Sequence, residues 1–250
     1  MNVEKINILN IPFSNLSESE FLENCQKGLV VTPNVDFFFY SHKDKDFYNI
    51  INSADFVLCD SQLILFASRF LNKRIKQKLS GSDIFPKFCF HHRNNTNIKV
   101  FLMGAMPGVA KKAANKINSQ VGRDIVTSFY SPKFGYENDV MESEKMISMF
   151  NDSGANVLAF GTGCPKSEKW LNIYKNKLNA EIIFCIGATI DFQAGNIQRA
   201  PKWMSHLCLE WLYRLLKEPK RLWRRYLIND PKFFWLILKE KMGIYKNPMS

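Results

Sequence analysis

The sequence has few of the features that build metal sites or disulfide frameworks. Its six cysteines lie far apart, with no CxxC pair and no closely spaced histidine to complete a zinc site. Most of them sit in or beside apolar runs, which favours small buried side chains in a reducing cytoplasm. The four histidines form no relay. We therefore expect no metal ion, no disulfide and no cofactor.

Several enzyme and membrane signatures are also missing. A GxSxG elbow is absent, which argues against acyl transfer, and the glycine-rich turns lack the GKS or GKT of a P-loop. No apolar run approaches the roughly 20 residues that a membrane-spanning helix needs. The N-terminus carries Glu4 and has no sustained apolar core, unlike a signal peptide. The sequence thus predicts a cytosolic protein, which could sit on a membrane only without crossing it.

The positive charge is unevenly distributed along the chain. The 34 Lys and Arg against 23 Asp and Glu give a net charge of +11. The last 52 residues, 199–250, hold 12 basic and four acidic residues, a net charge of +8, which leaves +3 for the first 198. The basic segment also holds four of the five tryptophans, and prolines at 219 and 231 divide it into two or three short helices. We expect this segment to meet an anionic partner.

The first 198 residues alternate between apolar runs of strand length and helical patterns. The runs lie near residues 30, 57, 100, 126, 158 and 184, and helical periodicity covers 43–53, 61–77, 107–121, 137–153 and 166–179. This alternation predicts an α/β core over 1–198, with a mostly parallel sheet and flanking helices, and a helical appendage over 199–250. A polar connection at 94–98 divides the runs into two halves of one sheet. Ligands bind beyond the carboxyl ends of such strands.

Polar residues follow the first two of these strands. Thr32 and Asn34 could hydrogen-bond a sugar or phosphate, although Asn34 could equally cap the next helix. Asp60 ends the second run, where a carboxylate can act as general base, and the competing interpretation is a helix cap. Spacing alone does not decide between the two roles of Asp60.

Three later strand ends contain glycine, which lets backbone amides approach a phosphate. The residues concerned are Gly104 and Gly108, Gly161 and Gly163, and Gly187 with Asp191. Lys166 is a cation beside the second pair, although Lys166 and Glu168 could simply be exposed side chains in the first turn of a helix. An acidic residue such as Asp191 can hold a ribose hydroxyl. Each turn alone is equally well explained as a tight turn before a helix.

Taken in order, the following blocks resemble the WecG/TagA/CpsF family of bacterial glycosyltransferases: TPNVD, ADFVLCDS, GSDI, FLMGAMPGVAKKAA, FGY, LAFGTGCPKSEKW, GATIDFQAGNIQRAP and LEWLYRLLKEPKRLWRRY. The match runs from about Thr32 to about Phe234. It implies catalytic roles for Asp60, Thr32 and Asn34. It also implies nucleotide contacts by Tyr136 and Asp191, and contacts with a lipid diphosphate by Arg214, Arg221 and Arg224, with Arg225 beside them.

The resemblance implies an activity as well. Such enzymes move a sugar, typically N-acetylmannosamine or its uronic acid and in some members glucose, from a UDP-sugar donor to an undecaprenyl-diphosphate-linked saccharide of the cell envelope. It further implies a Rossmann-like sheet and inverting, metal-independent transfer at an anionic inner-membrane surface. Family members occur as monomers and as larger assemblies, which leaves a homo-oligomer open.

Two departures from the family pattern bear on substrate choice. Ser61 stands where the family has a glycine after the aspartate, and Ser167 stands where it has a glutamine. A module that binds nucleotide sugars without catalysis is therefore one alternative. A basic nucleic-acid-binding protein is another, although no nucleic-acid motif accompanies the tail, so we expect no nucleic acid as partner.

Overall fold

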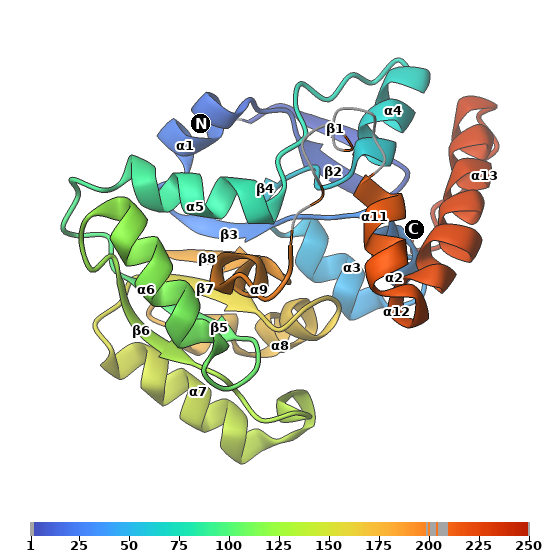
Figure 1. Cartoon of the computed structure of the whole chain (residues 1–250). Coiled ribbons are helices and arrows are strands. Elements are labelled where there is room, and N and C mark those ends of the chain that lie inside the picture. The colour runs from blue at the N-terminus through green and yellow to red at the C-terminus, as the bar shows by residue number, and fades with distance from the viewer. Residues whose placement is uncertain (1–2, 199, 201–203, 205–209, 250) are drawn as a thin grey trace.

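The computed structural model describes residues 3–198, 200, 204 and 210–249. A six-stranded, all-parallel sheet in the order β4-β3-β8-β7-β5-β6 forms its centre (Figure 1). The strands are β3 (Gly28–Val31), β4 (Phe56–Val57), β5 (Val100–Gly104), β6 (Val126–Tyr130), β7 (Val157–Gly161) and β8 (Ile182–Cys185). Each coincides with one apolar run, so the predicted Rossmann-like α/β fold is confirmed. The two halves are one sheet, because β8 pairs with β3 on one side and β7 on the other.

Helices cover both faces of the sheet. One face packs against α1 (Glu18–Asn24), α5 (Gly81–His91), α6 (Val109–Val121) and α9 (Thr189–Ala194). The other packs against α2 (Val35–Ser41), α3 (Lys45–Asn52), α4 (Gln62–Phe70), α7 (Val140–Asp152) and α8 (Lys166–Tyr174). Successive strand residues alternate between the faces, as a pleated strand requires. In β5, for example, Leu102 joins the first core and Phe101 and Met103 join the second.

The helix expected over 61–77 is shorter than the periodicity suggested. α4 ends at Phe70, where Asn72 turns the chain with φ +59°. Ile75 then folds back and its backbone N–H donates to the Ser68 hydroxyl at 3.3 Å. The apolar residues after Phe70 are therefore core residues of a loop.

A short antiparallel hairpin, not expected from the sequence, lies at the β4 edge of the sheet. It consists of β1 (Lys5–Ile8) and β2 (Ile11–Ser14). The Val57 backbone N–H donates to the Ser14 hydroxyl at 3.0 Å, which ties the hairpin to β4.

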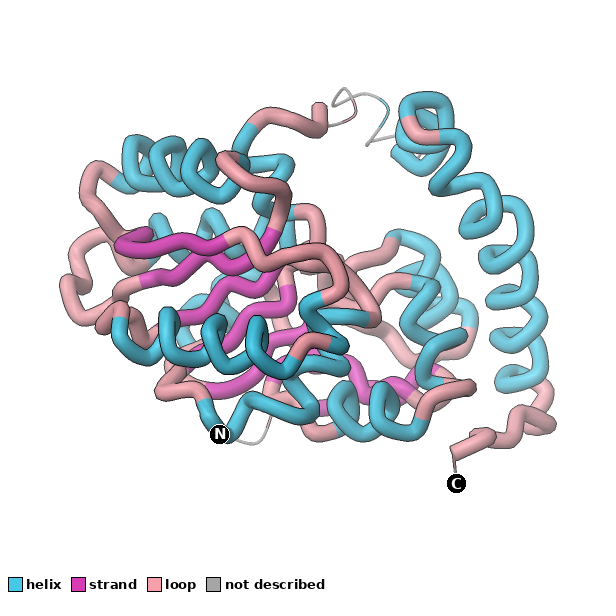
Figure 2. Tube along the Cα trace, turned by 90° about the horizontal axis from the view of Figure 1, so that it is seen from below, coloured by secondary structure: helices cyan, strands magenta, loops and turns pink. Residues whose placement is uncertain are grey.

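The described part of the appendage forms a column of helices along one side of the core (Figures 1 and 2). It contains α11 (Glu210–Lys217), α12 (Pro219–Arg224), the π-helical segment η3 (Arg225–Asn229) and α13 (Asp230–Lys241). Pro219 begins α12 and Pro231 lies in the first turn of α13, positions that proline tolerates. No helix within the described ranges is long and apolar enough to cross a membrane.

Candidate active site

The predicted residues of the core lie at one edge of the sheet. All six strands run parallel, so their carboxyl ends meet at that edge. Thr32 follows β3, and Asp60 follows β4 after a short connection. Gly104 and Gly161 are the last residues of β5 and β7, and Asp191 lies in the first turn of the helix after β8. This is the edge at which open α/β sheets bind their ligands.

Thr32 is buried between two elements of this edge. Its hydroxyl donates to the carbonyl of Cys185, the last residue of β8, at 3.2 Å. A Cβ at Gly81, the first residue of α5, would lie 3.1 Å from the same hydroxyl oxygen. The side chain therefore joins β3 to β8 beneath α5, and its contact with a sugar stays a prediction.

Asn34 caps helix α2, as one interpretation of the sequence predicted. Its Oδ1 accepts from the Asp36 backbone N–H at 3.0 Å. The cap uses the amide oxygen, and the amide nitrogen keeps two N–H donors that suit a sugar hydroxyl or a phosphate. The capping role and a role in ligand binding are therefore compatible.

Asp60 does not occupy the cap position that the alternative interpretation required. The N-cap residue of α4 is Ser61, whose φ of −144° is ordinary extended backbone. Serine in place of the family glycine therefore strains nothing there. The backbone N–H of Asp60 donates to the Pro33 carbonyl at 3.0 Å, and that of Leu79 donates to Cys59 at 2.8 Å. Asp60 is thus held between residues 32–34, which we call the TPN segment, and the chain that leads into α5.

Two pairs of glycines at this edge differ in what surrounds them. A Cβ at Gly104, where φ is +138°, would lie 2.5 Å from the Gly161 carbonyl carbon, and one at Gly161 would lie 2.9 Å from the Gly187 oxygen. These three backbones touch, so Gly104 and Gly161 serve the packing of strand ends. Gly108 and Gly163 also have positive φ, but a Cβ there would meet nothing within 4 Å. They are the positions at which a ligand could approach the backbone.

Gly108 is the N-cap of α6 and makes no side-chain cap. The Val109 N–H donates to the Met106 carbonyl at 3.0 Å, and no side-chain cap covers the next N–H groups of this 13-residue helix. Such groups and the helix dipole favour negative charge. Lys166, the cation near Gly163, forms an ion pair with Glu137 and lies 4.4 Å from the Phe134 ring.

Tyr136 is buried beside the end of β7. Its hydroxyl lies 2.6 Å from the Thr162 hydroxyl, and its ring packs on Phe160 with centroids 6.0 Å apart. Burial raises the pKa of the Tyr136 hydroxyl well above its ordinary value, so it is a neutral donor and acceptor. The predicted nucleotide contact by this side chain stays a prediction.

Glu168 is a buried carboxyl group beside Cys185, and the sequence interpretation missed its burial. The residue is not exposed on the helix surface. Its side chain is buried beneath the strand ends, and the residue is only 2% exposed. The hydroxyl of Ser167 donates to its carboxylate at 2.9 Å, and the Cys185 thiol also donates to it. Burial raises the pKa of Glu168 to about 7. Spacing could have located it, because Glu168 is one turn before the buried Leu171.

The arginines lie on the appendage helices. Arg214 is on α11, Arg221 and Arg224 are on α12, and Arg225 begins η3. Arg224 is exposed, with its guanidinium carbon 5.5 Å from the centre of the Trp223 ring. The side chains of the other three lie outside the described residues, so their predicted contacts stay predictions.

The appendage contacts the core next to the TPN segment. The Asn229 amide, at the end of η3, donates to the Asp36 carboxylate at 3.0 Å. Behind this contact, Phe233 is fully buried against Phe38, with ring centroids 5.1 Å apart. Asp36 is two residues after Asn34. The appendage is therefore anchored beside the first turn of α2, at the candidate site.

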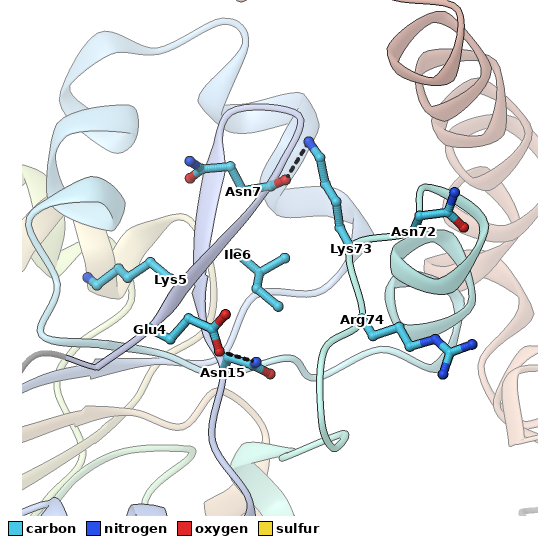
Figure 3. Close-up of a pocket in the computed structure, with 8 residues that line it drawn as sticks. All are labelled: Glu4, Lys5, Ile6, Asn7, Asn15, Asn72, Lys73 and Arg74. Atoms are coloured by element: carbon cyan, nitrogen blue, oxygen red, sulfur yellow. Dashed lines mark hydrogen bonds between the residues drawn. The ribbon is translucent and has the colours of Figure 1, made fainter.

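A shallow hollow lies elsewhere, between the β1–β2 hairpin and the turn after α4 (Figure 3). Its lining is polar and basic and includes Lys5, Lys73 and Arg74. None of the predicted site residues lines it, so it is not the candidate active site. Within the described ranges, no group of three or more His, Cys, Asp or Glu could hold a metal ion.

Comparison with known proteins covers nearly the whole chain. The model of a family described as "Glycosyl transferase WecG/TagA/CpsF family" matches residues 6–247. An N-acetylglucosaminyldiphosphoundecaprenol N-acetyl-beta-D-mannosaminyltransferase of Bacillus subtilis (strain 168) is 30% identical, over 96% of this chain and 95% of that protein. Proteins of the same name from Bacillus spizizenii and Staphylococcus aureus (strain MRSA252) are 27% and 25% identical, over 98% of this chain and 95% and 96% of theirs.

Proposed function

Since the chain belongs to the WecG/TagA/CpsF family and is a glycosyltransferase, we propose that it transfers N-acetylmannosamine or a related hexose from a UDP-sugar. The acceptor is an N-acetylglucosamine-bearing undecaprenyl diphosphate of cell-envelope biosynthesis. The names of the relatives support the sugar and the acceptor. The UDP carrier is what the family resemblance implies, and the open turns at Gly108 and Gly163 leave room for its diphosphate.

The observation that carries this proposal is the place of Asp60. It follows β4 at the carboxyl edge, is tied by its backbone N–H to Pro33, and directly precedes Ser61, the N-cap residue of α4. In the reaction, the Asp60 carboxylate accepts the proton of the acceptor hydroxyl. The hydroxyl oxygen then bonds to the anomeric carbon as the bond from that carbon to the UDP oxygen breaks. Attack from the opposite face inverts the configuration.

Negative charge develops on the departing diphosphate during this step. Backbone N–H groups at the start of α6 and around Gly163 are fixed donors for that charge. We infer that these amides stabilise the departing UDP without a metal ion. Tyr136 and Asp191 contact the nucleotide, and Thr32 and Asn34 contact the sugars.

The appendage, residues 199–250, supplies the acceptor side of the site. Arginine side chains bind phosphate oxygens in a bidentate manner, so Arg214, Arg221, Arg224 and Arg225 would hold the lipid diphosphate. The exposed Trp223, Phe234 and Trp235 would enter the headgroup layer of the inner membrane face. Each nearby cation contributes about 1 kcal/mol of attraction to anionic lipid, which favours reversible attachment.

The Asp60→Asn variant tests this proposal. It should fold and bind UDP as the wild type does, yet release UDP at least about a hundredfold more slowly in the presence of a lipid-linked acceptor, because it lacks the base. Asp124→Asn, which changes a carboxylate in the connection that precedes β6, is the matched control and should keep the wild-type rate. A wild-type rate in Asp60→Asn would falsify the role of Asp60. If neither the wild type nor Asp60→Asn releases UDP from any of a panel of UDP-sugars, the result would instead support the non-catalytic binding module.

A further inference from the structure

A second basic region lies within the core. Residues 61–82 contain five basic side chains and no acidic one, although the first 198 residues together carry only +3. The basic residues are Arg69, Lys73, Arg74, Lys76 and Lys78. Two of them have acidic partners, since Lys76 pairs with Glu20 at 2.8 Å and Lys73 with Glu240 at 2.7 Å. The segment comprises α4 and the chain after it, so it is separate in sequence from the basic appendage.

Helix α4 also exposes two aromatic rings. Phe66 and Phe70 are 42% and 52% exposed. They are four residues apart and therefore share one face of the helix. The remaining face is buried through Ile64, Leu65 and Ala67. Exposed rings indicate a contact surface when they are part of a larger apolar patch, so their surroundings decide what they mean.

The exposed face of α4 adjoins the appendage. The Lys241 ammonium, at the end of α13, donates to the Phe70 carbonyl at 2.8 Å and lies 5.4 Å from the centre of its ring. Figure 1 shows α4 and α13 at the same side of the molecule, and Figure 3 shows the turn that carries Arg74 next to α13. The two helices therefore belong to one surface.

The outward side of α13 also exposes apolar side chains next to basic ones, as α4 does. Phe234, Trp235 and Leu238 are each more than a third exposed, and Lys239 lies over the Trp235 ring at 5.5 Å. The acidic Glu240 is only 12% exposed and is occupied by Lys73 and by the Leu9 backbone N–H. We call the set Phe66, Phe70, Phe234, Trp235 and Leu238 the α4–α13 face. It is aromatic, and the exposed charges around it are basic.

We propose that the α4–α13 face binds the surface of an anionic bilayer, so that the core itself contacts lipid through Phe66 and Phe70. Aromatic rings can enter the headgroup layer of a bilayer, and neighbouring cations can bind its phosphates. An anionic bilayer therefore complements both the rings and the charges of this face. The inference rests on the proposed function only in expecting an acceptor that is held in a membrane. It adds a core element, α4, to the appendage.

The position of α4 gives this contact a consequence for the site. The helix begins directly after Asp60 and Ser61 and is nine residues long, which corresponds to about 13 Å. Phe70 is at its far end. Contact with lipid through the far end of α4 would thus hold Asp60 at about the length of this helix from the headgroups.

Sedimentation with vesicles of phosphatidylglycerol and phosphatidylcholine tests the proposal on the full chain. The Phe66→Ser, Phe70→Ser double variant should bind roughly fivefold more weakly or worse than the wild type. Phe90→Ser is the matched control, because Phe90 is 51% exposed and lies 4.6 Å from a cation, Arg93, at the other end of the core. It should bind within about twofold of the wild type, and so should Phe70→Leu, which keeps an apolar side chain.

A second pair of variants covers the case in which the double serine variant unfolds in a urea titration. Arg69→Glu, Arg74→Glu reverses two charges beside the face, and Lys111→Glu, Lys112→Glu reverses two exposed charges on α6. Only the first pair should weaken binding strongly. The proposal fails if the double serine variant or the Arg69, Arg74 pair binds within about twofold of the wild type, or if the controls weaken equally. It also fails if the wild type is a dimer that Phe66→Ser, Phe70→Ser dissociates without changing vesicle binding.

A parallel assay separates this proposal from the proposed function. With a water-soluble acceptor that carries a short alkyl chain, the double serine variant should keep the wild-type transfer rate while losing vesicle binding. If the wild type transfers no sugar but binds vesicles through Phe66 and Phe70, the proposed function fails and the α4–α13 face stands. If transfer occurs and vesicle binding does not depend on Phe66 and Phe70, only the proposal for the α4–α13 face is wrong.

Discussion

At the carboxyl edge of the sheet, strand ends touch backbone to backbone, whereas the appendage reaches the core through a set of side chains. A Cβ at Gly104 would meet the Gly161 backbone, and a Cβ at Gly161 would meet the Ile190 side chain and the Gly187 oxygen. The appendage is joined through the Asn229–Asp36 and Lys73–Glu240 contacts and the Phe233 ring. A strand end therefore cannot move without its neighbours, whereas a contact of the appendage can change with a single side chain. For the proposed transfer, this difference would combine a fixed position of Asp60 with an acceptor-binding segment that can adjust.

The largest effect should come from breaking the edge at Gly104. Gly104→Ala would place a methyl group 2.5 Å from the Gly161 carbonyl carbon at a φ of +138°, and backbone cannot rotate away as a side chain can. We expect a loss of roughly 4 kcal/mol in the free energy of unfolding. Gly122→Ala, with positive φ but nothing within 4 Å, is the control and should lose about 1 kcal/mol. Equal losses in urea unfolding would mean that the strand ends are not tightly packed.

The second effect concerns the buried carboxyl group beneath the edge. Glu168 has a folded-state pKa of about 7, above its ordinary 4.5. The folded state therefore holds this proton over a range in which the unfolded chain has released it. Its contribution to stability is complete below about pH 4.5 and is lost as pH rises to 7, by roughly 3 kcal/mol in total. Glu168→Gln keeps a polar group there but cannot ionise.

Urea unfolding of both proteins between pH 4.5 and 8 measures this effect. The stability of the wild type relative to Glu168→Gln should fall across that range, because groups common to both proteins cancel in the difference. His42 and His92, whose pKa values are lowered by burial, are among those groups. A difference that stays constant with pH would contradict the burial of an ionisable Glu168.

Local sequence pattern predicted most of the edge. The central strands β5, β7 and β8 were visible because each is buried on both faces and so reads as an unbroken apolar run, whereas the edge strand β6 is partly exposed and contains Thr127 and Ser128. Asp60 could be located because it follows such a run. Glu168 was missed because a charged residue at the start of a helix is usually exposed, and the weaker signal was its spacing from Leu171.

The attachment of the appendage could not be predicted in the same way. Its basic and aromatic composition and its division at the prolines are local properties, and the structure has them. The Asn229–Asp36 contact joins residues 193 positions apart, and no periodicity in either segment refers to the other. The extension of its surface onto α4 depends likewise on the contact between Lys241 and Phe70.

The smallest effect on stability, and the most informative about the joint between the two regions, should come from Asn229. Asn229→Ala removes the hydrogen bond to Asp36, which contributes about 1 kcal/mol. Asn247→Ala removes another contact of the appendage, with the Tyr48 hydroxyl at 3.4 Å, away from the TPN segment. In both variants, the backbone amide hydrogens of the appendage should exchange with solvent faster than in the wild type. Only Asn229→Ala should also slow transfer to the lipid-linked acceptor, because Asp36 is in the first turn of the helix that Asn34 caps. If both variants slow transfer equally, the appendage acts through its docking as a whole and the Asn229 contact has no separate role in positioning the site.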